Sequence, residues 1–317
     1  KNYVPRSEPA SYAAGGKVVH YDTVEWIYIP DAQTTMNALV AGEIDFWETP
    51  TPDIVELMEG NKDVTIKVID PLGTQGWLRP NHLNPPFDNP KARQALLHMV
   101  NQEDYLQSII GDPKFWSACP AYFMCNTPLD TDIGSEALGN QDLEKARQLL
   151  KEGGYNGETL ILMDPTDIPV LHGASLVTAQ MLREIGAKVE VQAMDWSTLT
   201  SRRAEKKSIA DGGWNIFHTY STGADVSSPI ANIGISGGCV EKAWFGWPCD
   251  ETLEKLRDDF SREADPAKQK AIGDALQARA YEVVPYVNYG QWFQPTAFRS
   301  SLKGVLISPV PFFWNIQ

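Results

Sequence analysis

The sequence predicts a globular α/β protein of about two domains. Segments with the two-residue period of strands alternate along the chain with segments that have the periodicity of helices, which is the pattern of α/β folds. The length of 317 residues suits two domains of ordinary size. With 43% hydrophobic and 21% charged residues, the composition is that of a folded protein rather than a disordered one.

The N-terminal part predicts a loop followed by short strands and helices. Prolines and a glycine pair make residues 1–20 a loop. Asp31 is placed to cap a helix over 34–40, and Gly42 is placed to end it. The other elements expected here are strands over 24–29, 44–47 and 64–69 and a helix over 53–60.

The rest of the chain has longer elements. A segment rich in Pro, Asn and Gly predicts a loop over 71–90. Beyond it we expect helices over 91–100, 142–153, 172–185, 250–260 and 266–283, strands over 160–163, 188–192 and 214–218, and an extended aromatic segment over 285–298.

Charge excludes one class of partner. The 41 acidic and 27 basic residues give a net charge of −14, and such a surface repels nucleic acid. No apolar run reaches the length of a membrane-spanning helix. The chain begins with Lys1 and has no basic and apolar leader, so we expect that a signal peptide was removed or that this is the rear part of a longer chain.

The four cysteines form two local pairs, Cys119 with Cys125 and Cys239 with Cys249. Neither spacing is that of a zinc knuckle. Both pairs enclose short loops with Pro and aromatic residues, which a disulfide would staple; four free buried thiols are the alternative. Disulfides would indicate an oxidising compartment, and we expect the periplasm.

Catalytic motifs are mostly absent. Gly234–Gly238 matches the G-x-S-x-G pattern, but all five histidines precede Ser236, so we interpret it as a loop. Asp164 and Asp167 offer paired carboxylates, although Asp and Pro are also the usual residues of a turn after a strand. The histidines are scattered singly, and we expect no metal, no cofactor and no enzymatic activity.

Four segments, in order along the chain, resemble motifs of the family 5 extracellular solute-binding proteins of ABC importers, the dipeptide- and oligopeptide-binding type. Met36–Asp45 is similar to the family's "ALxxGExD" segment, and Asn84–Leu96 resembles its "N-x-x-x-P-F-x-D-x-x-V-R-x-A" signature. Asp142–Tyr155 resembles the helix that ends in "E-A-G-Y", and Gln180–Val191 resembles the "L-x-x-I-G-I-x-V-x-L" unit.

The resemblance implies a periplasmic-binding-protein-like type II two-lobed fold. Residues 1–74 would be the rear part of the first lobe, 75–290 the complete second lobe, and 291–317 the hinge recrossing and the return to the first lobe. The N-terminal portion of the first lobe would be missing from the chain. The resemblance also implies a periplasmic receptor, which we expect to be monomeric, that closes on a small solute between its lobes and delivers it to the membrane subunits of an ABC permease.

One ligand contact is implied by the resemblance. Peptide binders of the family hold the ligand's α-ammonium with an Asp in a "G-W-x-x-D" loop, and Asp225 matches that Asp. The family Trp is absent, and Tyr220 and Thr222 stand near its place. A carboxylate in a dry cleft makes a strong charge-assisted hydrogen bond with a cation, while a turn-capping Asp is the alternative. Cys239 and Cys249 match a disulfide of the dipeptide-binding branch.

Four further ligand contacts are expected from position at the lobe crossings, where hinge packing is the alternative. Trp77, Tyr289 and Trp292 would form aromatic walls, and Arg79 would pair with a carboxylate. The predicted ligand is a peptide or a peptide-like solute that bears an amine. The rival hypothesis is a carbohydrate-active hydrolase with a Trp-lined cleft and paired carboxylates; a receptor that senses its ligand without importing it is a third.

Overall fold

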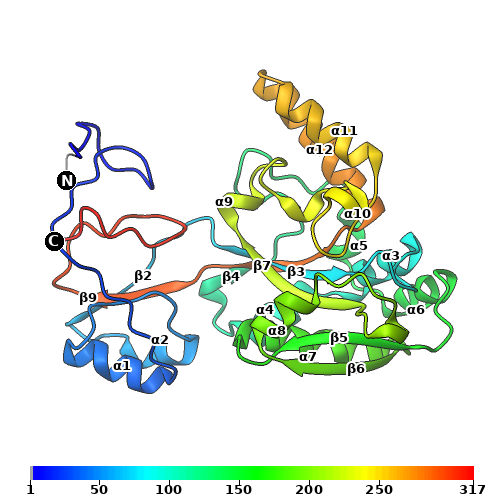
Figure 1. Cartoon of the computed structure of the whole chain (residues 1–317), viewed down its shortest axis with the longest axis horizontal. Coiled ribbons are helices and arrows are strands. Elements are labelled where there is room, and N and C mark those ends of the chain that lie inside the picture. The colour runs from blue at the N-terminus through cyan, green and yellow to red at the C-terminus, as the bar shows by residue number, and fades with distance from the viewer. Residues whose placement is uncertain (1–2) are drawn as a thin grey trace. The chain divides into compact units, whose positions relative to one another are not determined.

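The computed structural model describes residues 3–317, which divide into two compact units (Figure 1). Unit 1 comprises the chain up to Gly73 together with Phe293–Gln317, and unit 2 comprises Thr74–Trp292. The chain therefore passes between the units twice, after Gly73 and after Trp292. No helix within residues 3–317 is long and apolar enough to cross a membrane.

Unit 1 is a small antiparallel sheet with two helices. The strands lie in the order β1-β9-β2, and α1 and α2 cover one face of this sheet (Figure 1). Side chains from both helices pack on β2 and β9 to form a small apolar core. The bounds of these elements are α1 Ala32–Ala41, β1 Phe46–Trp47, α2 Pro52–Met58, β2 Val64–Val68 and β9 Pro295–Arg299.

The predicted caps of α1 are confirmed. The Asp31 carboxylate accepts a hydrogen bond from the Thr34 backbone N–H at 2.7 Å. Gly42 ends the helix with a φ of 78°, a conformation that glycine adopts without steric cost.

The prediction of a strand over 24–29 is wrong. The segment has no assigned secondary structure and no ladder partner in the described chain, and its large side chains face solvent: Trp26 is 71% exposed and Tyr28 is 89% exposed. Alternating residues predict a strand only when a neighbouring strand supplies hydrogen bonds, and unit 1 as described supplies none here.

Unit 2 is built on a six-stranded mixed sheet in the order β4-β8-β3-β7-β5-β6. The pairs from β4 to β7 are antiparallel, whereas β7, β5 and β6 run parallel, so the carboxyl ends of these three strands share one edge. The bounds are β3 Thr74–Pro80, β4 Trp116–Ser117, β5 Thr159–Pro165, β6 Lys188–Met194, β7 Ile216–Thr222 and β8 Val287–Trp292.

Helices cover both faces of this sheet. The helices α4 and α7 pack on one face. On the other face, α8 and the loop 239–249 enclose an aromatic cluster that contains Trp214, Phe217 and Trp247. The helices are α3 Pro90–Met99, α4 Gln102–Ile109, α5 Glu136–Gly139, α6 Leu143–Glu152, α7 Pro169–Glu184, α8 Trp196–Arg202, α9 Gly223–Val226, α10 Cys239–Lys242, α11 Glu251–Arg262 and α12 Pro266–Val283.

The loop predicted over 71–90 is partly wrong, because it contains β3. This strand lies between β8 and β7 and is almost completely buried. Gly76 is required there: a Cβ at this position would lie 2.0 Å from the ring of Tyr289. The sequence analysis missed this strand because central strands are recognised by apolar runs, whereas β3 contains several polar and small residues.

Both predicted cysteine pairs are bonded. Cys119 is joined to Cys125 and Cys239 to Cys249. The second disulfide closes the loop 239–249, which brings Trp247 against Trp214 with ring centroids 5.9 Å apart.

Candidate functional site

Two of the predicted ligand residues, Thr222 and Trp292, lie at one end of the sheet of unit 2. Across the strands, Thr74 of β3 pairs with Thr222 of β7 on one side and with Trp292 of β8 on the other. Thr74 and Trp292 are also the first and last residues of unit 2. The end of the sheet that carries Thr222 and Trp292 is therefore the end where the chain enters and leaves the unit.

Asp225 lies just beyond this row, in the short helix α9 that follows β7. Its carboxylate accepts hydrogen bonds from the hydroxyls of Thr222 at 3.0 Å and Ser221 at 3.5 Å. The carboxylate is exposed, and it forms no ion pair with a cation of the described chain. Hydroxyl donors orient this charge without neutralising it, so it is available to an external cation.

Aromatic rings continue from this end of the sheet into the core of unit 2. Tyr220 meets Trp292 edge to face at 5.8 Å, Trp292 stacks near Tyr289 at 6.4 Å, and Tyr289 stacks on Tyr105 at 5.1 Å. Tyr220 is 46% exposed, whereas Trp292 is 3% exposed. Of the predicted aromatic contacts, Tyr220 thus has the greatest open surface.

Two of the predicted aromatic walls are interior residues of unit 2. Trp77 is 1% exposed and stacks on Tyr286 with ring centroids 4.5 Å apart. Tyr289 is fully buried, and its hydroxyl donates to the backbone carbonyl of Thr219 at 3.2 Å. These placements favour the packing alternative for both residues.

Arg79 is also placed inside unit 2, and the carboxylate contact expected of it does not fit this setting. Its guanidinium donates to the carbonyls of Gly234 at 2.6 Å, Pro285 at 2.8 Å and Phe245 at 2.6 Å. Burial lowers the pKa of Arg79 to about 9. Arg79 thus joins three segments of the unit. Because these carbonyls occupy its donors, we do not include Arg79 among the proposed ligand contacts.

A histidine that the sequence did not single out lies at the carboxyl end of β5. Nδ1 of His172, in the first turns of α7, is 2.9 Å from both carboxylate oxygens of Asp164, which is buried. Asp167 accepts from the backbone N–H of Trp196 at 2.8 Å. The two carboxylates of the hydrolase hypothesis are thus engaged in structural contacts. In the sequence, the contact could have been inferred from the eight residues that separate Asp164, at the end of a strand, from His172, in the first turns of the next helix.

The remaining candidates from the sequence are the Gly234–Gly238 motif and the scattered histidines. The hydroxyl of Ser236 donates to the Glu254 carboxylate at 3.1 Å within a loop, as interpreted from the sequence. In residues 3–317, no three side chains of His, Cys, Asp or Glu come together as metal ligands.

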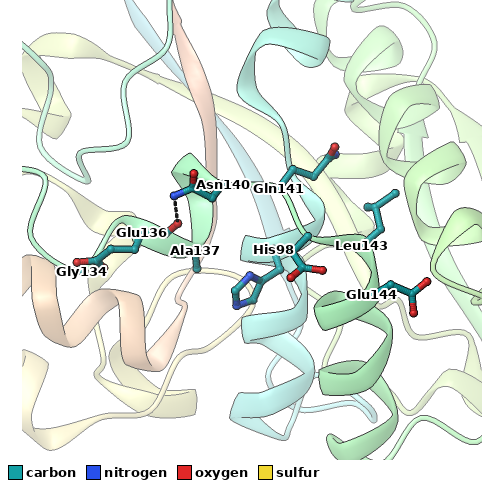
Figure 2. A pocket seen from close by; sticks show the side chains of 9 residues that line it. His98, Gly134, Glu136, Ala137, Asn140, Gln141, Leu143 and Glu144 are labelled. Carbon is teal, nitrogen blue, oxygen red and sulfur yellow. Dashed lines mark hydrogen bonds between the residues drawn. The ribbon is translucent and has the colours of Figure 1, made fainter.

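An open pocket of about 720 Å³ lies elsewhere in unit 2, between the end of α3 and the start of α6 (Figure 2). His98 borders it, and Asn140 donates to the backbone carbonyl of Glu136 at 3.1 Å on its rim. The carboxylate of Asp142 is engaged there as the N-cap of α6. None of the predicted ligand residues lines this pocket, and its openness does not suit an enclosed solute.

Comparison with known proteins gives a consistent set of relatives. The profile of the family described as "Bacterial extracellular solute-binding proteins, family 5 Middle" matches residues 1–242. A probable peptide ABC transporter periplasmic-binding protein, y4tO of Sinorhizobium fredii, is 37% identical over 321 aligned positions, which cover all of this chain and 60% of the relative. The glutathione-binding protein GsiB of Escherichia coli is 27% identical and covers 91% of this chain and 56% of its own length. The chain thus spans three-fifths or less of these relatives.

Solved structures show the same fold. The periplasmic binding protein DppA of Helicobacter pylori, in complex with the peptide STSA, aligns with a TM-score of 0.75 at 21% identity over 91% of this chain and 55% of its own. AgaA of Agrobacterium tumefaciens, in complex with agropinic acid, aligns with a TM-score of 0.74 at 20% identity over 92% of this chain and 60% of its own.

Proposed function

The chain belongs to the family 5 bacterial extracellular solute-binding proteins and has the α/β fold of type II periplasmic binding proteins, and from this premise we propose that it is the periplasmic receptor of an ABC importer. It captures a peptide or a peptide-like solute that bears a free amine and passes it to a membrane permease. Its location is the periplasm, and it works as a monomer without a cofactor and without turnover.

The observation that carries this proposal is the exposed carboxylate of Asp225, which has hydroxyl donors but no cationic partner within residues 3–317. It lies beyond the end of the sheet that carries both chain crossings of unit 2. An α-ammonium that reached this carboxylate would gain a charge-assisted hydrogen bond, stronger than a neutral one. The exposed ring of Tyr220, two residues before Thr222, offers an apolar and π-rich surface to the residue that follows the amine.

The relatives support the class of ligand. One is named for peptides, another for glutathione, and one structural neighbour holds the peptide STSA. The ligands named for these relatives are consistent with the contact to a ligand amine that we propose for Asp225. No contact in the described chain favours the hydrolase hypothesis, because Asp164 is paired with His172 and Asp167 with a backbone N–H.

To test this proposal, the protein is incubated with a mixture of tri- and tetrapeptides, with and without N-terminal acetylation. Native mass spectrometry then identifies the peptides that remain bound. We expect the protein to retain free-amine peptides and to reject the acetylated ones. Asp225→Asn should weaken binding of a retained peptide by about 2–5 kcal/mol, because the ammonium loses its counter-charge.

Asp211→Asn is the matched control. Asp211, like Asp225, accepts a hydrogen bond from a hydroxyl three residues earlier, here that of Ser208 at 2.6 Å. This control should bind peptides as the unaltered chain does. Equal retention of free and acetylated peptides, or an unchanged affinity in Asp225→Asn, would contradict the amine contact.

A further inference from the structure

Arg203, directly after α8, holds its guanidinium against four aromatic rings. The distances from its central carbon to the ring centroids are 4.7 Å for Phe245, 5.0 Å for Trp244, 5.3 Å for Trp196 and 5.8 Å for Phe217. We call Arg203 and these four rings the Arg203 box. Cation–π contacts of this kind hold a guanidinium in place without using its hydrogen-bond donors.

The guanidinium in the Arg203 box has no polar partner among the described residues. Within residues 3–317 it makes no hydrogen bond and no ion pair, and Nε is sealed from solvent without an acceptor. Two other enclosed arginines are bonded: Arg79 donates to backbone carbonyls on three segments, and Arg93 donates to the carbonyls of Val283 and Phe87 at 2.8 Å. Buried donors in folded proteins are nearly always bonded, so Arg203 differs from these two arginines in a way that needs an explanation.

The geometry leaves one edge of the guanidinium usable. Arg203 is half-buried, and of its nitrogens Nε is the one closed to solvent. The edge formed by the two terminal nitrogens is therefore the side open to an approaching acceptor. A planar fork of this kind matches the two oxygens of a carboxylate. Because the rings already restrict the side chain, binding would cost little further conformational entropy.

The local charge favours an anion. Residues 202–207 have the sequence Arg-Arg-Ala-Glu-Lys-Lys, with four cations and one acid, in a chain whose net charge is −14. The acid, Glu205, is engaged by Lys207 at 3.1 Å. Lys206 lies over the ring of Trp247 at 5.7 Å, beside the box. This basic segment would raise the local concentration of anions.

We propose that the Arg203 box is a binding site for a carboxylate, presented either by a small organic acid or by a Glu or Asp side chain of a polypeptide. The site is separate from Asp225: Phe217 lies five residues before Thr222 along β7, which is roughly 17 Å at the rise of a strand. It binds an anion where Asp225 binds a cation, so the two sites differ in the charge that they select.

The experiment follows the arginine side chains of the full 317-residue chain, labelled with ¹⁵N, by NMR. Sodium acetate and tetraglutamate are titrated separately at constant ionic strength, with sodium chloride as the balancing salt. We expect a saturable shift of the Arg203 signals. Saturation by acetate would show that a small organic acid is enough to fill the site. Saturation by tetraglutamate but not by acetate would show that the carboxylate comes from a polypeptide side chain.

Three variants separate this site from general attraction by positive charge. Arg203→Gln should weaken binding of the saturating probe at least tenfold, and Arg203→Lys about fivefold, because an ammonium lacks the planar fork. Arg202→Gln removes the same charge one residue away and should change the affinity by less than twofold. Equal weakening by Arg202→Gln and Arg203→Gln would overturn the proposal. So would the absence of a saturable Arg203 shift in the unaltered chain, a result that depends on no variant.

Discussion

The hydroxyl of Thr222 donates a hydrogen bond to the carboxylate of Asp225 at 3.0 Å and accepts one from the Asp225 backbone N–H at 3.3 Å. One side chain therefore both caps α9 and orients the carboxylate that we assign to the ligand amine. The position of the Asp225 carboxylate and the local folding of α9 therefore depend on the same oxygen atom, the Thr222 hydroxyl.

Thr222→Val keeps the shape of the side chain and removes this oxygen. We expect the affinity for a retained peptide to fall by about 1–2 kcal/mol, because the carboxylate loses an orienting donor and α9 loses its cap. Thr222→Ser keeps the hydroxyl and is the control, with an affinity close to that of the unaltered chain. Titration calorimetry measures both; a Thr222→Val variant that binds as tightly as Thr222→Ser would show that the hydroxyl does not position Asp225.

Arg79→Lys tests the interior role that the structure gives this residue. A single ammonium cannot reach the carbonyls of Gly234, Pro285 and Phe245 together, so the free energy of unfolding of unit 2 should fall by about 3 kcal/mol. Chemical denaturation measures this change. The affinity of the folded variant for a retained peptide should stay within about twofold of that of the unaltered chain. A folded variant with greatly weakened peptide binding would restore Arg79 as a ligand contact.

The disulfide between Cys239 and Cys249 should stabilise unit 2 mainly through the unfolded state. Replacing both cysteines by serine should lower the free energy of unfolding by about 2–3 kcal/mol, the value expected for a closed loop of this length. The loop carries Trp247, which packs on Trp214, so near-ultraviolet circular dichroism reports its loosening. An unchanged denaturation midpoint would mean that the packing of the loop holds it without the bond.

Much of the fold was predictable because the signals were local. The predicted cap Asp31 and stop Gly42 identified α1, and the helical periodicity of residues 142–153 identified α6. Both helices are confirmed. The errors concern strands, whose formation depends on partners distant in sequence. Residues 24–29 alternate as a strand does but have no partner in the described chain, whereas β3 has partners on both sides and a sequence typical of a loop.

The candidate site was predictable in part. Tyr220, Thr222 and Asp225 adjoin in sequence, so a motif could identify them together, and the register of β3 with β7 and β8 then brings Trp292 to the same end. Trp77 and Arg79 come from the same strand but lie deeper in unit 2, and position along the chain does not reveal depth. The Arg203 box unites residues from three separate segments, namely α8 with its C-cap, β7 and the loop 239–249. No sequence pattern signals such a convergence.

His218 should make unit 2 sensitive to acid. Its ring is fully buried, with Nε2 2.8 Å from the Thr178 hydroxyl and Nδ1 3.3 Å from that of Ser175, and burial lowers its pKa to about 3. The unfolded chain binds a proton near the ordinary pKa of 6.5, so between about pH 6 and pH 3 the unfolded state holds one proton more than the folded state at this residue. This single proton should reduce the free energy of unfolding by about 1.4 kcal/mol for each pH unit of acidification in that window.

Chemical denaturation at a series of pH values measures this slope. His218→Gln removes the titrating ring and should flatten the dependence between pH 6 and pH 3, whatever its stability at neutral pH. His20→Gln is the matched control, because His20 is exposed in unit 1, and its slope should equal that of the unaltered chain. Carboxylates that titrate in the same range contribute equally to all three proteins, so the difference in slope isolates His218. An equal slope in His218→Gln would show that this histidine does not resist protonation in the folded protein.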